Sequence, residues 1–170
     1  MKKLLTILFV LIGFYSLAQN TITTDHFTVT GLVKKEFTFT LSFLENFESK
    51  PFSDVVITNH KGDKKGTIKN LHVISLKDIL KDVEPNEDNP KLLSEFYITF
   101  IASDDYKVVY SWNEIFNSPT GDSIFIITSK DGKKMNEMRE SILMITPTDY
   151  NTGRRYIKGL SKIVFSRLNK

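Results

Sequence analysis

The chain of 170 residues contains no cysteine. That absence excludes disulfides, a thiol nucleophile, iron–sulfur clusters and any zinc or molybdenum site with a thiolate ligand. Charge of one sign is also scarce, because 23 basic residues stand against 20 acidic residues and the formal net charge is +3. A balance this small gives no reason to expect a nucleic-acid partner. The length suits one domain.

Common catalytic motifs are missing as well. The chain has no G-x-S-x-G motif of a serine hydrolase and no glycine fingerprint of a dinucleotide-binding fold. Segment 62–67 places two glycines around Asp-Lys-Lys, but it is one residue short of a phosphate-binding loop and has no lysine after the second glycine. His26, His60 and His72 share no metal-ligand spacing. We therefore expect a solvated turn at 62–67 and a surface or structural role for each histidine.

The first residues have the pattern of a secretory signal peptide. Lys2 and Lys3 precede an almost unbroken apolar run to Leu17, and small residues stand two apart at Ser16 and Ala18. We expect cleavage after Ala18, which makes 1–18 the signal peptide and 19–170 a single exported domain, periplasmic or secreted. An uncleaved anchor is the alternative, but the run is shorter than the roughly 20 residues that a spanning helix needs.

Aromatic residues are plentiful in the rest of the chain, and 13 Phe, 6 Tyr and 1 Trp supply the bulk for a core. Apolar residues alternate with Thr in the first segments, as in half-buried strands. The pattern predicts strands at 27–30, 37–41, 54–58, 67–73, 96–102, 106–110, 123–128 and 142–146, and one or two strands around Gly159 within 155–168.

Short helices are predicted between these strands. Segment 42–47 has one apolar face, and Ser75 precedes an apolar stripe that continues to Val83 before Pro85. Ser75 and Ser111 each have an acidic residue three positions later, the spacing of a capping box. Many strands, few helices and no βαβ alternation predict an α+β domain built on mixed or antiparallel sheet.

Two clusters could carry chemistry. Asp104-Asp105-Tyr106 is an acidic turn between two strands, for which Asx-type turn chemistry is the simpler interpretation. Arg154, Arg155 and Lys158 could hold an anion such as phosphate. Arg155 and Lys158 would face opposite sides of a regular strand, so a bulge near Gly159 would be needed to bring them together. The alternative is a charged, exposed strand.

Five segments stand in a familiar order and spacing, namely 76–80, 98–106, 112–115, 142–147 and 155–160. They resemble in turn the L-x-d-L-L helix, the v-x-f-x-a-x-D-G-Y strand and turn, the l-x-E-l helix, the l-x-l-v-x-P strand and the R-x-V-K-W-L segment of the sulfite-oxidase-type molybdopterin-binding domain. The resemblance runs from Phe27 to Phe165. It implies a sulfite-oxidase-like α+β fold, with mixed β-sheets, a few short helices and a pocket for the pyranopterin of the molybdenum cofactor.

The chain departs from that pattern at the metal. Members of the family bind molybdenum through one cysteine thiolate, in a loop that corresponds here to Thr58, Asn59 and His60. A neutral Thr or Asn cannot replace a soft anionic thiolate. Asp105 and Gly159 also replace the usual turn Gly and the usual Trp. We assign no catalytic residue and no metal ligand. The resemblance places the cofactor-binding pocket at Thr58, Asn59, His60, Asp104, Tyr106, Arg155 and Lys158.

Three hypotheses follow. The first is an exported, non-catalytic binding or interaction module that has no cofactor and takes a small anionic or heterocyclic ligand or a periplasmic protein partner. The second is a molybdopterin-dependent oxidoreductase that holds the cofactor without cysteine, through His60 or oxygen ligands. The third is a structural subunit whose apolar strand edges dock a periplasmic partner. None of them involves nucleic acid or, after signal cleavage, a membrane.

Overall fold

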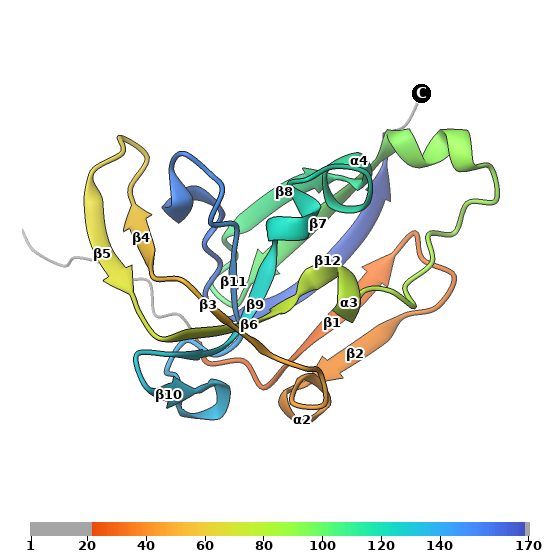
Figure 1. Ribbon diagram of the computed structural model, residues 1–170. Helices are drawn as coiled ribbons and strands as arrows, with labels where there is room; N and C mark the ends of the chain where they lie inside the picture. The colour runs from red at the N-terminus through yellow and green to blue at the C-terminus, as the bar shows by residue number, and fades with distance from the viewer. Residues whose placement is uncertain (1–21, 169–170) are drawn as a thin grey trace, which may run out of the picture.

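The computed structural model describes residues 22–168, so the expected signal peptide and its cleavage site lie outside the described part. The largest sheet has five strands in the order β2-β1-β12-β7-β8 (Figure 1). These are β1 (His26–Gly31), β2 (Phe37–Thr40), β7 (Phe96–Ala102), β8 (Lys107–Ser111) and β12 (Leu160–Arg167). β1 and β12 run parallel and the other neighbours antiparallel. The sheet is therefore mixed, as expected.

A second sheet has the strand order β10-β9-β6-β3, with β11 paired to β9. Its strands are β3 (Lys50–Phe52), β6 (Leu71–Ser75), β9 (Phe125–Lys130), β10 (Lys133–Lys134) and β11 (Leu143–Ile145). All of its pairs are antiparallel. Leu143, Met144 and Ile145 are completely buried, so β11 lies inside the domain.

The remaining elements are short. A separate hairpin consists of β4 (Val55–Thr58) and β5 (Lys64–Ile68). The α-helices are α2 (Leu41–Leu44), α3 (Leu76–Ile79) and α4 (Trp112–Phe116). Within residues 22–168, no helix has the length and apolar character to cross a membrane. The described part of the chain also has four 3-10 helices: η1 (Pro90–Glu95), η2 (Gly121–Ser123), η3 (Met135–Glu137) and η4 (Thr152–Arg155).

One cluster of buried side chains joins the two large sheets. β7 shows why the sequence pattern works, since Phe96, Ile98, Phe100 and Ala102 are buried and the residues between them are partly exposed. Side chains alternate between the faces of a strand, so every second residue reaches the core. The predicted strands at 27–30, 37–41 and 96–102 are confirmed.

Several boundaries differ from the sequence expectations. The segment 67–73 is broken by a turn at Asn70, where φ is +52°, and its two halves belong to different sheets. The helix predicted from Ser75 to Val83 ends at Ile79, although Leu80 and Val83 are still buried. The strand predicted from 155 begins only at Leu160. In each case tertiary packing buries the apolar residues without continuing the regular element.

The two expected capping boxes behave differently. Ser111 Oγ accepts a hydrogen bond from Glu114 N at 3.0 Å, and Glu114 Oε2 accepts one from Ser111 N at 3.2 Å, so this box forms. Ser75 precedes α3 but its side chain makes no cap hydrogen bond. The shorter Asp78 side chain replaces the usual Glu at the third position.

Replacing Ser111 by alanine is expected to lower the free energy of unfolding by about 1 kcal/mol, the usual cost of losing an N-cap. Ser75→Ala is the matched control and should cost much less, because no cap hydrogen bond is lost there. Urea denaturation of both variants measures the difference. Equal losses would contradict these cap assignments.

Candidate functional site

The seven sequence-predicted site residues lie on three segments around η4. Thr58, Asn59 and His60 belong to the β4–β5 hairpin, and Asp104 and Tyr106 belong to the β7–β8 turn. Arg155 ends η4, and Lys158 lies between η4 and β12. In Figure 1 the blue segment that contains η4 stands between the β4–β5 hairpin and β8. The contacts of η4 with the hairpin and with the β7–β8 turn determine how much space is left for a ligand.

η4 packs directly on the end of β4. Thr152 Oγ1 donates a hydrogen bond to Val56 O at 2.7 Å and accepts one from Thr58 N at 3.1 Å. A Cβ added to Gly153 would lie 2.1 Å from Thr58 O, so only glycine permits this approach. The Thr58 hydroxyl is buried and has no hydrogen-bond partner among residues 22–168. η4 thus packs on the Thr58 carbonyl, whereas His60 is exposed and Thr58 also borders a cavity of about 370 Å³.

η4 also contacts the β7–β8 turn. Tyr106 Oη donates a hydrogen bond to Arg154 O at 2.6 Å. Asp104 Oδ1 accepts one from Tyr106 N at 3.2 Å, which is the Asx-type turn considered from the sequence. Asp105 adopts φ +64°, a left-handed conformation that favours glycine but that Asp also tolerates.

Arg155 is held by carboxylates rather than facing open space. Its Nε donates to Asp149 Oδ2 at 2.7 Å, its Nη2 donates to Asp149 Oδ1, and its Nη1 donates to Glu114 Oε1 at 2.9 Å. The guanidinium lies 4.3 Å from the centroid of the Tyr110 ring. The hydrogen bonds to Asp149 are the main reason that the pKa of Arg155 is raised above its ordinary value. Burial raises the pKa of Tyr110 to about 12.

Lys158 belongs to a different ion-pair cluster. Its Nζ donates to Glu140 Oε1 at 3.0 Å, and Lys130 Nζ lies 3.5 Å from Glu140 Oε2. Burial opposes the charge on Glu140, but the hydrogen bonds and charges of Lys158 and Lys130 together lower its pKa. Lys130 Nζ also donates to Tyr156 Oη at 3.3 Å. Arg155 and Lys158 therefore belong to separate ion-pair clusters, Arg155 with Asp149 and Glu114 and Lys158 with Glu140.

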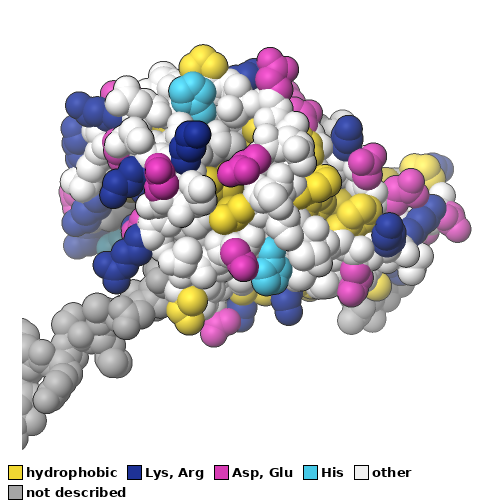
Figure 2. Space-filling model, turned by 90° about the horizontal axis from the view of Figure 1, so that it is seen from below, with side chains coloured by type: hydrophobic (Ala, Val, Ile, Leu, Met, Phe, Trp, Pro, Cys, Tyr) yellow, Lys and Arg dark blue, Asp and Glu magenta, His cyan; other side chains and the backbone are white. Residues whose placement is uncertain are grey.

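Asn59 shapes the hairpin turn. Its Oδ1 accepts hydrogen bonds from Lys61 N at 2.9 Å and Asp63 N at 3.0 Å, and its Nδ2 donates to Asp63 Oδ2 at 3.0 Å. His60 and Lys64 are exposed. Figure 2 shows Lys and Arg side chains gathered on the side of the molecule where this hairpin lies. The turn is exposed, as expected, but it ends at Asp63, because β5 begins at Lys64.

A small cleft remains beside η4. Its volume is about 230 Å³, and it is bordered by three of the predicted residues, Asp104, Tyr106 and Lys158. Ala102, Gly153 and Tyr156 complete it and were missed by sequence reasoning. Tyr156 stands between Arg155 and Lys158 in the motif, so its position was the one available signal. Burial raises the pKa of Tyr156 to about 12, which keeps its phenol protonated and able to donate.

The partners of the cations were also missed. Asp149, Glu114 and Glu140 lie 6, 41 and 18 residues from the cations that they pair with. No spacing rule connects residues so far apart before the fold is known. Within residues 22–168, no group of three or more His, Asp or Glu side chains is arranged to hold a metal ion.

Comparison with known proteins agrees with this architecture. A scan against protein-family models and a search of curated proteins found no match. Among solved structures, the chain is similar to the sulfane dehydrogenase SoxCD from Paracoccus pantotrophus, with a TM-score of 0.57 and 12% sequence identity. The match covers 88% of this chain and 39% of the SoxCD chain. At this identity the likeness concerns the fold alone, and it confirms the expected α+β, sulfite-oxidase-like fold of mixed sheets and short helices.

Proposed function

We propose that this protein is an exported binding module, built on a sulfite-oxidase-like fold, that does no molybdenum chemistry. The observation that carries the proposal is that the segment at Thr58 has no thiolate and is packed against η4. The sequence supplies no thiolate anywhere, and η4 is seated on the Thr58 carbonyl through Gly153. Threonine and asparagine are poor ligands for a metal that the family holds through sulfur.

The proposed ligand site is the cleft between the β7–β8 turn and η4. At about 230 Å³ it is smaller than the roughly 300 Å³ at which most small-molecule sites begin, so it suits a single ring or a small anion. Tyr106, a residue that is 44% exposed, and Tyr156 offer aromatic surface. Lys158 adds a positive charge that Glu140 only partly offsets, because Glu140 also pairs with Lys130. A small anionic or heterocyclic ligand fits this combination.

Metal and pterin analysis of the protein purified from its native host tests the proposal. We expect neither molybdenum nor pterin in stoichiometric amount, and an N-terminus at Gln19 in the exported fraction. Stoichiometric molybdenum would overturn the proposal in favour of an oxidoreductase that binds the cofactor without cysteine. A full-length chain found only in the cytoplasm would overturn the export.

Ligand binding at the cleft is tested by NMR titration with inorganic phosphate as the anionic probe and pterin as the heterocyclic probe. Saturable shifts are expected at Asp104, Tyr106 and Tyr156 with at least one probe. Lys158→Met should weaken binding about tenfold, the effect of losing one charge-assisted hydrogen bond. Lys162→Met is the control, because Lys162 is exposed and lies outside the cleft. No saturable shift, or equal weakening in both variants, would contradict the assignment.

A further inference from the structure

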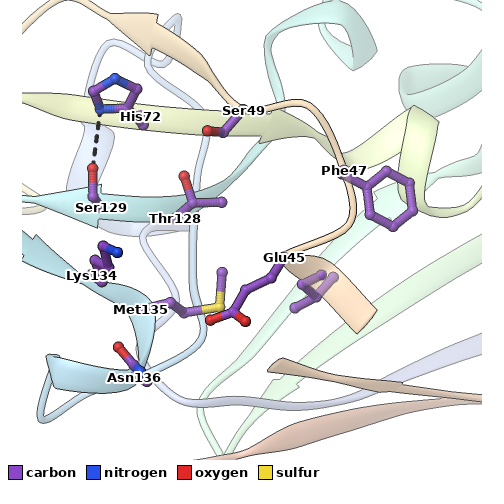
Figure 3. Close-up of a pocket in the computed structure, with 10 residues that line it drawn as sticks. Glu45, Phe47, Ser49, His72, Thr128, Ser129, Lys134, Met135 and Asn136 are labelled. Atoms are coloured by element: carbon purple, nitrogen blue, oxygen red, sulfur yellow. Dashed lines mark hydrogen bonds between the residues drawn. The ribbon is translucent and has the colours of Figure 1, made fainter. Parts of the chain in front are cut away.

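Another cavity lies away from the η4 cleft. It has a volume of about 450 Å³, within the roughly 300–1,000 Å³ typical of small-molecule sites. One wall comes from α2 and the chain that follows it, and the other comes from the second sheet and η3 (Figure 3). Ten residues line it: Leu44, Glu45, Phe47, Ser49, His72, Thr128, Ser129, Lys134, Met135 and Asn136.

The lining combines an apolar base with an unpaired hydroxyl. Leu44 is completely buried, Met135 is 2% exposed, and Phe47 is partly buried. Beside them, Thr128 Oγ1 is buried without a hydrogen-bond partner among the described residues. Buried polar atoms normally have a partner, so a Thr128 hydroxyl left alone points to a bound molecule that supplies one.

Charges of opposite sign face this cavity from its two walls. Glu45 follows α2, whereas Lys134 belongs to β10, and Figure 3 shows them on opposite sides with Met135 between them. Within residues 22–168, neither side chain makes an ion pair, so their charged atoms are more than 4.0 Å apart. A simple anion would be repelled by Glu45 and a simple cation by Lys134.

His72 and Ser129 give the rim a fixed polar edge. His72 Nδ1 and Ser129 Oγ share a hydrogen bond of 3.1 Å, drawn as the dashed line in Figure 3. The register of β6 and β9 brings these two residues opposite each other. Because this bond engages one ring nitrogen, the other ring nitrogen of His72 is left for solvent or a ligand.

We propose that this cavity binds a small zwitterion, namely a free α-amino acid with an apolar side chain. The ammonium group of the ligand pairs with Glu45, and its carboxylate pairs with Lys134. The apolar side chain lies on Leu44, Phe47 and Met135. A polar atom of the ligand hydrogen-bonds the Thr128 hydroxyl. This site is independent of the η4 cleft.

Calorimetric titration with L-leucine tests the proposal, with N-acetyl-L-leucine and L-leucinamide as analogues that each keep one charge. L-leucine should bind saturably, and each analogue about tenfold more weakly, as expected for the loss of one charge-assisted contact. Absence of saturable heat with L-leucine would overturn the proposal. Equal binding of N-acetyl-L-leucine would overturn it too, because the site would then recognise only an anion.

Four charge variants locate the binding. Glu45→Gln and Lys134→Met should each weaken L-leucine binding about tenfold. Glu48→Gln and Lys133→Met are the matched controls, since both residues are exposed neighbours that do not line the cavity. Controls that weaken binding as much as the test variants would overturn the proposed contacts.

Thr128→Val separates a binding role of this hydroxyl from a structural one. The valine has nearly the same shape and removes a buried hydroxyl that lacks a partner. The variant should melt at the same or a higher temperature than the original protein and bind L-leucine more weakly. A lower melting temperature with unchanged binding would overturn the assigned role of Thr128.

Discussion

Replacing Arg155 by methionine is expected to lower the free energy of unfolding by about 3 kcal/mol, because a buried ion pair that loses one partner leaves an uncompensated charge behind. Asp149 would be that charge, since its side chain is only 15% exposed and accepts two hydrogen bonds from Arg155. Glu114 would lose its partner as well. The value lies at the low end for buried pairs, because 22% of the Arg155 side chain is exposed and solvent screens part of the effect.

The matched control for this substitution is Arg154→Met. Arg154 is the adjacent residue with the same charge, but it is exposed and its guanidinium makes no ion pair with the described residues. Surface substitutions of this kind change the free energy of unfolding by about 0.5 kcal/mol or less. Urea denaturation followed by circular dichroism compares the two. If the two variants lost the same stability, Arg155 would not anchor η4.

Replacing Gly153 by alanine is expected to cost about 2–3 kcal/mol, as overpacking of a tight contact does. The new Cβ would lie 2.1 Å from Thr58 O, a backbone atom that cannot rotate away. Relief requires η4 to move off β4, which would also strain the two hydrogen bonds of Thr152 to Val56 and Thr58. The amide resonances of these three residues should therefore shift.

Gly66→Ala provides the control for the same hairpin. Nothing lies within 4 Å of a Cβ at Gly66, and its φ is not positive, so alanine fits there. Such a replacement is expected to be neutral or to stabilise by up to about 1 kcal/mol, through the unfolded chain. Thermal or urea denaturation measures both variants. A neutral Gly153→Ala would show that η4 is not seated on Thr58.

The strands were the part of this fold that the sequence predicted best. In β7 each second residue is apolar and buried, because the period of a strand and the period of the pattern are both two. The Ser111 capping box was equally local, since all of its atoms lie within four consecutive residues. The order of such segments carried the resemblance that led to the sulfite-oxidase-like fold.

Sequence reasoning was less successful where regular structure stops. Segment 67–73 has an unbroken extended pattern, yet a left-handed turn at Asn70 divides it between two sheets. Segment 155–168 was expected to be strand from its start, but Arg155 ends a 3-10 helix instead. Local propensity is a weak guide in such places, because burial against distant elements outweighs it.

What the sequence by itself determined was the missing thiolate and the order of elements, since both are properties of the residues and of their immediate neighbours. Only the tertiary structure determines which residues Arg155, Lys158 and Thr58 contact. Arg155 meets Glu114 from 41 positions earlier, and Thr58 is covered by Gly153. Contacts between residues so far apart depend on the packing of whole elements and not on any local spacing. For that reason the absence of cysteine was visible at once, whereas the packing of η4 on the Thr58 carbonyl appeared only in the folded chain.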